Sequence, residues 1–319
     1  MLQCHTGSVL NLRHLRTLQE VAERGGVGAA AEALHFTPSA VSQQIAALQA
    51  ELDVAVLERV GRGVRLTAAG EILLAHAAPL LAAERSARAA VADAYGSGTV
   101  RMRVGLFASV AVGLMPTLAA DLTENAPHLR LWTREIDLEQ ARTDLVRSRL
   151  DAAFVLDYPE AAETWSPSLA LADIGSDTFS VALPPGHHVD DEVVRLRDLA
   201  DEHWILASNG TYVGRAVRSA CRRAGFEPRV SHEVGEQSTA LALVQAGLGV
   251  TLVSDFGRLS PPPGVQIRPL RERVSRRLLL AYAAVNAERP VLHELIAASR
   301  RAMTLVHDQP IAASATDGA

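Results

Sequence analysis

The sequence predicts an α+β multi-domain protein in which a small helical unit, one long helix and a larger α/β region follow one another. Three observations support this prediction. Apolar residues recur at helical spacing near the N-terminus, an Ala- and Leu-rich stretch runs from Ala68 to about Tyr95, and short apolar runs typical of strands alternate with helical segments after Thr99. With 319 residues the chain is long enough for two or three domains.

The composition is that of an ordinary globular protein, with 48% hydrophobic and 21% charged residues. The formal net charge is −5, so binding to DNA would depend on local geometry rather than on bulk charge. No secretion signal and no apolar run of membrane-spanning length is found, and Cys4 and Cys221 lack metal-ligand spacing. We therefore expect a cytoplasmic protein with no membrane partner, in which Cys221 is a half-buried helical residue rather than a redox sensor.

The first elements form a compact unit of three helices. An apolar stripe that begins at Leu12 predicts a helix ended by Gly25 and Gly26, and a short Ala-rich helix follows at about 28–34. Thr37 is a good N-cap for the third helix, and Pro38 suits the first helical position. The length of this third helix, the turn before it and its inward apolar stripe match a helix-turn-helix.

The outward face of the third helix is short, polar and uncharged. It is formed by Ser39, Ser42, Gln43 and Ala46. Such a face fits the major groove of B-DNA, where Gln43 or Gln44 can bond to both hydrogen-bonding positions of adenine and Pro38 can contact a thymine methyl group. The alternative is a surface helix that is merely neutral.

A hairpin wing is predicted after the third helix. Two short strands, 54–57 and 64–66, flank a loop with two Gly and two Arg residues. Arg59 is expected to be structural, paired with a carboxylate. The predicted contacts to DNA come from the helix N-terminus, its outward face and the wing, and they comprise Thr37, Pro38, Ser39, Ser42, Gln43, Gln44, Arg62 and Arg65.

Thr67 is predicted to cap the long helix. The apolar residues of this helix form a loose seam, which favours packing on a copy of itself, and Pro79 should kink it. The seam consists of Ile72, Leu73, Leu80, Leu81 and Val91. Beyond this helix the strand candidates are VRMRVGLF, LRLWTRE, LDAAFVLD, FSVALP, HWILAS, GVTLVS and LLLAYA. Because helical segments separate most of them, we expect largely parallel sheets.

Two groups of segments resemble LysR-type transcriptional regulators. LNLRHLRTLQEVAERGGVGAAAEAL and HFTPSAVSQQIAALQAELDVAVLERVGRGVRLTAAGE are similar to the DNA-binding domain of that family. GLFASVAVGLMPTLAADLTENAP, SRLDAAFVLD and ALVQAGLGVTLV are similar to its effector domain, a two-lobed fold like that of periplasmic solute-binding proteins. The chain departs from the family pattern at Gly28, where Thr or Ser is common, and at Ser254-Asp255, where Pro is frequent.

The resemblance implies a regulator that binds an interrupted palindrome in double-stranded DNA as a homodimer or homotetramer. RNA polymerase is a further partner if the protein activates transcription. The predicted boundaries are 1–9 for a disordered tail, 10–67 for a winged helix-turn-helix, 68–96 for a linker helix, 97–306 for the effector domain and 307–319 for a disordered tail. Within the effector domain, lobe I comprises 99–172 and 269–306, and lobe II comprises 173–268.

A small-molecule effector, such as a carboxylate, is expected in the cleft between the lobes, where helix N-termini would hold an anionic group. The resemblance places Ser109 there. Asp157 either lines the cleft or forms a hinge salt bridge, and each of the other residues could instead be only a helix cap. The candidate contacts are Ala108, Ser109, Val110, Asp157, Ser208, Asn209, Thr211, Ser238 and Thr239.

Two other classes of protein are less consistent with the sequence. A solute-binding protein would carry a signal peptide and would not need the helix-turn-helix. An enzyme or a metal site could be suggested by His187 and His188 beside Asp190, but this run has loop composition and lacks spacing such as HExxH. No GxSxG, P-loop or GxGxxG motif occurs. We therefore expect neither catalysis, nor a cofactor, nor a bound metal.

Overall fold

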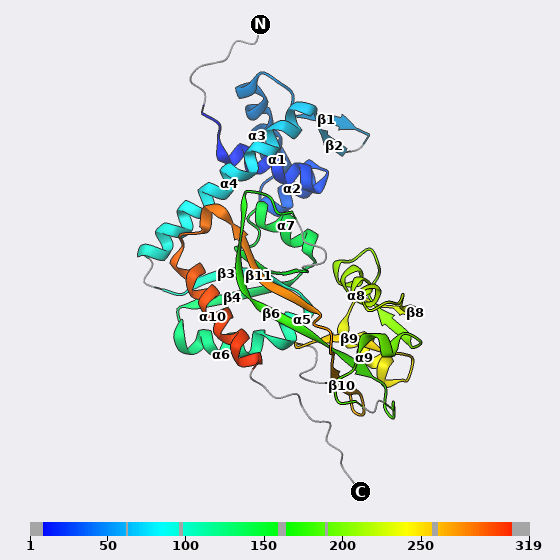
Figure 1. Ribbon diagram of the computed structural model, residues 1–319. Helices are drawn as coiled ribbons and strands as arrows, with labels where there is room; N and C mark the ends of the chain where they lie inside the picture. Colours follow the sequence, from blue (N-terminus) through cyan, green and yellow to red (C-terminus); the bar gives the residue numbers. More distant parts are fainter. Residues whose placement is uncertain are drawn as a thin grey trace. The chain divides into compact units, whose positions relative to one another are not determined.

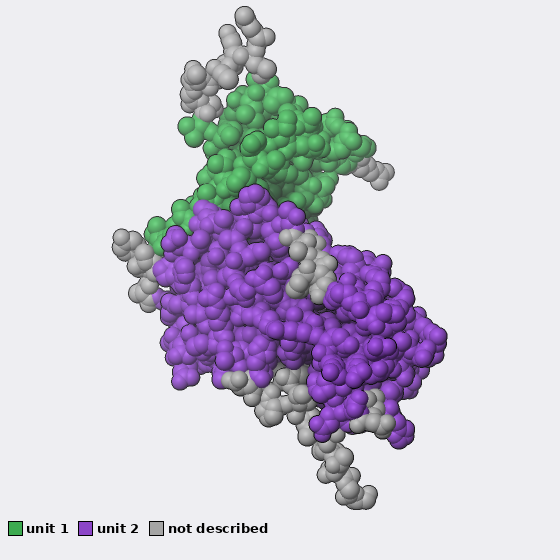
Figure 2. Space-filling model, viewed as in Figure 1, with its two compact units in different colours: residues 1–92, 146–148 green, residues 93–145, 149–319 purple. Residues whose placement is uncertain are grey.

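The computed structural model describes residues 9–61, 63–95, 98–158, 164–188, 191–256 and 261–307, with the side chains of 93–95 left aside. The predicted disordered tails therefore lie outside the described residues, apart from Val9 and His307. Contacts between Cα atoms divide the chain into two compact units (Figure 2). The first unit holds the N-terminal helices, the hairpin and most of the long helix, and the second holds the remaining sheets and helices.

The elements of the first unit are α1 (Leu12–Arg24), α2 (Val27–Leu34), α3 (Pro38–Leu52), β1 (Leu57–Val60), β2 (Gly63–Leu66) and α4 (Ala68–Tyr95) (Figure 1). The predicted start of α3 is confirmed, because the Thr37 hydroxyl accepts a hydrogen bond from the N–H of Ala40 at 3.2 Å. The start of α4 is confirmed in the same way, with Thr67 accepting from the N–H of Gly70 at 3.1 Å.

The hairpin begins later than the sequence indicates, at Leu57 rather than at residue 54. Gln49 of α3 accepts hydrogen bonds from the N–H groups of Val56 and Leu57, and the carbonyl of Val56 accepts one from the N–H of Thr67. These bonds attach the segment before the strand to the neighbouring helices and leave it no partner strand. From Leu57 onward, β1 and β2 pair in antiparallel register.

The long helix contributes part of the core of the first unit. Its Ala77 and Leu81 are buried with Leu15, Leu18 and other residues of the three-helix unit. The predicted seam is therefore divided, because Leu81 faces this core whereas other members face solvent. The exposed members are Ile72, Leu80 and Val91.

The elements of the second unit are β3 (Val100–Leu106), α5 (Ala108–Gly113), α6 (Met115–Asn125), β4 (Leu129–Glu135), α7 (Leu138–Val146), β5 (Ala152–Asp157), β6 (Leu169–Leu183), the 3-10 turn η2 (Leu196–Leu199), β7 (His203–Leu206), α8 (Tyr212–Arg223), β8 (Arg229–Glu233), α9 (Gln237–Gln245), β9 (Thr251–Ser254), β10 (Gln266–Pro269), β11 (Ser275–Ala283), the 3-10 turn η4 (Ala284–Asn286) and α10 (Pro290–His307). In the described part of the chain, no helix is both long and apolar enough to cross a membrane.

The expectation of largely parallel sheets is wrong for much of this unit. The main sheet has the strand order β10-β6-β11-β5-β3-β4, with β9 also on β6. Among the named strands, β3 pairs in parallel with β4 and β5, and β7 with β8. Two isolated parallel bridges join Val194 to Leu270 and Trp204 to Val250. The partners of β6 and β11, in contrast, run antiparallel. The cause is β6, which is much longer than the predicted segment FSVALP and is followed back along its length by β11.

Strands β6 and β11 connect two lobes, each with its own core (Figure 1). The first half of β6 pairs with β11, and its last residues pair with β9 and β10. One core gathers around Phe154, Leu280 and Leu295, and the other around Trp204 and Leu196. The predicted lobe boundary at 172/173 falls inside the continuous strand β6, so the chain passes between lobes without a loop.

Candidate DNA-binding surface and effector cavity

The outward face of α3 is available to a ligand. Val41, Ile45 and Leu48 are buried against the other helices of the unit. The predicted contact residues that are exposed on α3 and its N-cap are Thr37, Pro38, Ser39, Ser42 and Gln43. No acidic residue lies in the first turn of α3, so the positive end of its dipole is not neutralised locally.

The two adjacent glutamines differ in their surroundings. Gln44 is half-buried, and its side-chain oxygen accepts a hydrogen bond of 2.6 Å from the hydroxyl of buried Thr17 on α1. The side chain of Gln43 is exposed and forms no hydrogen bond with any described residue. Gln44 therefore holds α3 against α1, which departs from its expected role at the DNA, and Gln43 is the glutamine that can read a base.

The wing also differs from expectation. Arg62 lies outside the described residues. Arg65 is directly opposite Glu58 in the hairpin, donates to its carboxylate at 2.5 and 3.0 Å, and has its pKa raised by this hydrogen bond. Arg59, expected to be paired, is exposed and forms no ion pair within the described ranges. The alternation of strand β1 places it away from Glu58, so Arg59 replaces Arg65 as the uncommitted cation of the described wing.

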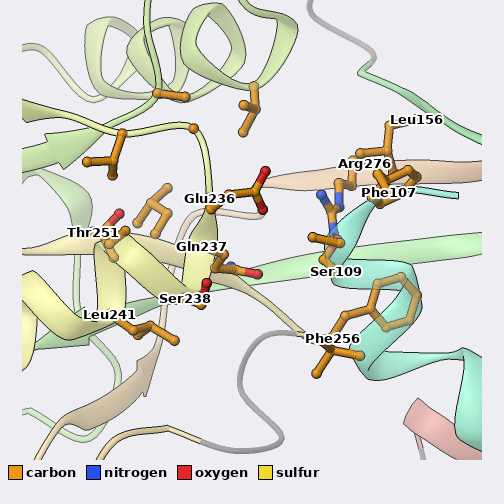
Figure 3. A pocket seen from close by; sticks show the side chains of 18 of the residues that line it. Phe107, Ser109, Leu156, Glu236, Gln237, Ser238, Leu241, Thr251, Phe256 and Arg276 are labelled. Atoms are coloured by element: carbon orange, nitrogen blue, oxygen red, sulfur yellow. Dashed lines mark hydrogen bonds between the residues drawn. The ribbon is translucent and has the colours of Figure 1, made fainter. Parts of the chain in front are cut away.

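The second unit contains a cavity of about 1000 Å³, a size suited to a small organic molecule (Figure 3). Most of its lining is apolar or aromatic. The lining residues are Phe107, Ala108, Ser109, Val112, Arg134, Glu135, Ile136, Asp137, Gln140, Leu156, Tyr158, Phe179, Ile205, Leu206, Ala207, Val213, Val234, Gly235, Glu236, Gln237, Ser238, Ala240, Leu241, Thr251, Leu252, Phe256, Pro262 and Arg276. They come from both lobes and from the strands that connect them.

Only part of the predicted effector contacts lie in this cavity. Ala108, Ser109 and Ser238 line it. Val110 is instead buried in the core of its lobe, and Thr239 is exposed. Successive residues of a helix point in different directions, so Val110 and Thr239 do not share the orientation of Ser109 and Ser238.

The segment 208–211 serves as a helix cap, which was the alternative reading of these residues. Thr211 accepts a hydrogen bond from the N–H of Gly214 and donates one to the carbonyl of Ser208, so its hydroxyl is engaged at the start of α8. The described lining includes the preceding residue Ala207 but not Ser208, Asn209 or Thr211. Asp157 is also outside the lining and lies 3.6 Å from Arg277 on the paired strand, consistent with a hinge salt bridge.

Arg276, which the sequence analysis did not select, is the most highly connected polar residue of the cavity. Its side chain is buried, and its Nη2 donates to Ser109 at 3.1 Å and to Ser254 at 2.9 Å. Its Nε donates to Asp177 at 2.6 Å. Arg276 thus bonds to a residue of each lobe from the strand that passes between them. The rings of Phe107, Phe179 and Phe256 surround its guanidinium group.

The electrostatics of this cluster follow from its burial. Burial alone would lower the pKa of Arg276, but the charge of Asp177 raises it above its ordinary value. Burial raises the pKa of Asp177, and the Arg276 charge opposes that rise. Burial also raises the pKa of Tyr158, so this phenol keeps its proton. No sequence motif identifies this cluster, because Asp177 and Arg276 meet only through the pairing of β6 with β11.

The histidines and the cysteine singled out in the sequence are not placed for metal binding or thiol reactivity in the described residues. Within the described residues no three His, Cys, Asp or Glu side chains are placed to hold a metal ion. His187, one of the two histidines considered above, lies 3.1 Å from Glu202. Cys221 is fully buried rather than half-buried, and burial raises the pKa of its thiol to about 12. The reactive thiolate is therefore scarce at neutral pH.

Two family models cover most of the chain. Residues 12–71 match the bacterial regulatory helix-turn-helix protein, lysR family, and residues 96–304 match the LysR substrate binding domain. The chain belongs to the LysR family. It is therefore a DNA-binding transcriptional regulator with an effector-binding domain, in a family of regulators rather than enzymes.

Individual LysR relatives match along most of their length. The HTH-type transcriptional regulator XapR of Escherichia coli K12 is 30% identical over 290 residues, which cover 90% of this chain and 97% of XapR. The transcriptional dual regulator GltC of Bacillus subtilis is 31% identical over 263 residues, which cover 81% of this chain and 86% of GltC.

Solved LysR structures have the same fold. A full-length OxyR variant from Pseudomonas aeruginosa superposes with a TM-score of 0.70 at 21% identity, covering 92% of this chain and 98% of that chain. Full-length BenM gives a TM-score of 0.56 at 25% identity, covering 95% of this chain and 99% of that chain.

Proposed function

We propose that this LysR-family regulator recognises an interrupted palindrome as a homo-oligomer, and that a small organic molecule in the cavity controls its occupancy of DNA. The observation that carries the proposal is the neutral, exposed face of α3 on a firmly packed unit. The side chains of Ser42 and Gln43 lie on that face and make no hydrogen bond with described residues. Short polar side chains of this kind allow a helix to enter the major groove deeply.

The exposed apolar residues of α4 support self-association. Ile72, Leu80 and Val91 are between 46% and 64% exposed, although Ala77 and Leu81 of the same helix are buried in the core of the first unit. Covering such side chains with a second copy removes apolar surface from water. A two-fold assembly requires two half-sites related by the same symmetry, which explains the palindrome. The choice between homodimer and homotetramer stays a prediction.

Control by a ligand is supported by the position of the cavity. Its lining comes from both lobes and from Arg276, whose guanidinium bonds to a residue of each lobe. A molecule that binds there contacts groups whose spacing depends on the lobe arrangement, so it stabilises one arrangement over another. RNA polymerase would be a further partner if this shift activates transcription, and the cytoplasm is the expected place of action for a protein that binds chromosomal DNA.

The decisive experiment is selection of fragmented genomic DNA by the purified protein, followed by sequencing. We expect enrichment of a few interrupted palindromes. The double variant Ser42→Ala/Gln43→Ala should lose this preference, because each lost base contact costs about 1–3 kcal/mol of discrimination. The control Gln245→Ala/Thr304→Ala removes exposed polar groups of the second unit and should retain the enrichment. Equal enrichment by the first variant and the wild type would refute the assignment of α3.

A further inference from the structure

We propose that the effector is an organic cation, with a protonated amine on a compact apolar body and a neutral hydrogen-bond acceptor such as a carbonyl oxygen. This inference rests on the proposed function, because it concerns the ligand of the same cavity. It replaces the anionic effector that the sequence favours. The two arginines of the lining are paired with buried carboxylates, whereas its two glutamates have no ion-pair partner among the described residues.

The charge of Arg276 is already balanced. Its Nε donates to Oδ2 of Asp177 at 2.6 Å, its Nη2 lies 2.5 Å from the same oxygen, and the N–H of Asp255 donates to Oδ1 at 2.8 Å. Both oxygens of this fully buried carboxyl therefore face donors, and the Arg276 guanidinium is committed to it. An anionic ligand at Arg276 would place a second negative charge beside the ion pair in a poorly solvated site.

The charge of the second arginine of the lining is also paired, although its buried Nε finds no acceptor among the described residues. Arg134 forms an ion pair with Asp144, which is fully buried and also accepts a hydrogen bond from Gln140. Arg149, which does not line the cavity, lies 3.5 Å from the same carboxylate. Neither Arg134 nor Arg276 is therefore an uncommitted cation that would select a carboxylate ligand.

The glutamates of the lining, unlike its arginines, have no ion-pair partner among the described residues. Glu135 ends β4 in one lobe, and Glu236 precedes α9 in the other. Both line the cavity, and neither has an ion-pair partner among the described residues. Glu236 also lies at the N-terminus of α9, where its negative charge offsets the dipole that would otherwise attract an anion. Figure 3 shows the carboxylate of Glu236 turned into the cavity toward Arg276.

Two hydroxyl groups define the acceptor that the ligand should carry. Tyr158 is 3% exposed and lines the cavity, and although the Arg276 guanidinium lies close to its oxygen, its hydroxyl proton has no acceptor within the described ranges. The nearby guanidinium of Arg276 has only N–H donors, so it cannot take the phenol proton. Ser109 accepts from Arg276, which leaves its own proton for a ligand. A neutral carbonyl satisfies these donors without adding charge beside Asp177.

Four size-matched probes test the inference by isothermal titration calorimetry on the full chain. Phenethylamine is a cation, phenylalaninamide is a cation with a carbonyl, 3-phenylpropanamide is neutral, and 3-phenylpropanoate is an anion. We expect the two cations to bind more tightly than the neutral amide, and the acid to bind most weakly. The inference is overturned if 3-phenylpropanoate equals or exceeds phenethylamine in affinity, or if neither cation binds at millimolar concentration.

Variants assign the binding to individual residues. Glu236→Gln should weaken phenethylamine binding about tenfold, the effect expected for a lost charged hydrogen bond. Glu124→Gln makes the same charge change at an exposed residue outside the lining and should leave binding unchanged. Tyr158→Phe should weaken phenylalaninamide about fivefold, and phenethylamine less, because only the former offers the carbonyl. Unaltered affinities in both cavity variants would place the amine elsewhere and overturn the inference.

The outcomes separate this inference from the proposed function. If genomic selection yields palindromes but the acid binds and alters DNA occupancy, the regulator function stands and the cationic effector is refuted. If the cations bind through Glu236 but no palindrome is enriched, the ligand chemistry stands and the reading of α3 fails.

Discussion

Gly70, in the first turn of α4, shows how closely a single residue can connect two elements. A β-carbon at this position would lie against the carbonyl oxygen of Val56, well inside contact distance, and beside the side chain of Leu66. The obstacle is backbone that is itself hydrogen-bonded, so it cannot move aside easily. Gly28, in α2, has open space in the same direction.

We predict that Gly70→Ala destabilises the first unit by about 1–3 kcal/mol, as overpacking does elsewhere. Gly28→Ala should instead stabilise it by about 0.5–1 kcal/mol, because alanine is the better helix former. Thermal unfolding of the two variants beside the wild type measures both effects. A Gly70→Ala protein as stable as the wild type would mean that α4 can shift away from Val56.

At the same scale, residues differ in how far the sequence predicts their roles. The caps Thr37 and Thr67 were predictable, because a cap bonds to an N–H only three residues further along the chain. Arg276 was not, because its partner Asp177 is 99 positions away and becomes a neighbour only through strand pairing. The sequence also contains no sign that Gln44 bonds to Thr17, because that bond forms only when α1 and α3 pack together. Gln44 was therefore predicted to contact DNA.

Among the elements, α6 and α10 form a pair held by charges from distant parts of the chain. Arg301 of α10 donates to both oxygens of Asp121 on α6, at 2.8 and 2.6 Å. This hydrogen bonding lowers the pKa of Asp121 below its ordinary value of 3.8. The unfolded chain therefore binds a proton at this position more readily than the folded chain.

We predict that Asp121→Asn lowers stability by up to about 1 kcal/mol at neutral pH, since Arg301 is half-exposed and solvent weakens the pair. The contribution of Asp121 is present above its unfolded pKa and is lost as pH falls through the lowered folded pKa. The difference between wild type and variant should therefore shrink as pH falls from about 7 to about 3. Thermal unfolding across this pH range provides the measurement, and a difference that is constant with pH would exclude the ionised pair as its cause.

The lengths and directions of strands were harder to predict than their existence. β6 begins well before the apolar segment FSVALP. Its earlier residues alternate in burial and include Asp173, Gly175 and Asp177, which are not typical of strands. Charged residues and glycine are depleted in strands, so the sequence signal is weak there. The strand is held in place by β11, whose long apolar run pairs with it.

For the whole molecule, assembly is the property that the exposed part of α4 governs. We predict that Leu80→Asp lowers the oligomeric state, because a charge in an apolar contact between copies would be buried without a partner. Leu305→Asp, at an exposed leucine of α10, is the matched control and should leave the assembly intact. Light scattering after size-exclusion chromatography measures the mass of each variant. An unchanged mass for Leu80→Asp would place the interface elsewhere.

The place of β11 in the sheet determines the order in which the two lobes can be completed on the ribosome. β11 lies between β5 and β6 in the sheet, although it follows β7, β8, β9 and β10 in the chain and is therefore synthesised after them. The core around Trp204 requires no residue beyond Val274, whereas the core around Phe154 also requires Leu280 and the apolar face of α10. The lobe that begins first in the nascent chain is thus the last to close. Until β11 emerges, β5 and β6 present unpaired edges, which a chaperone would shield from other nascent chains.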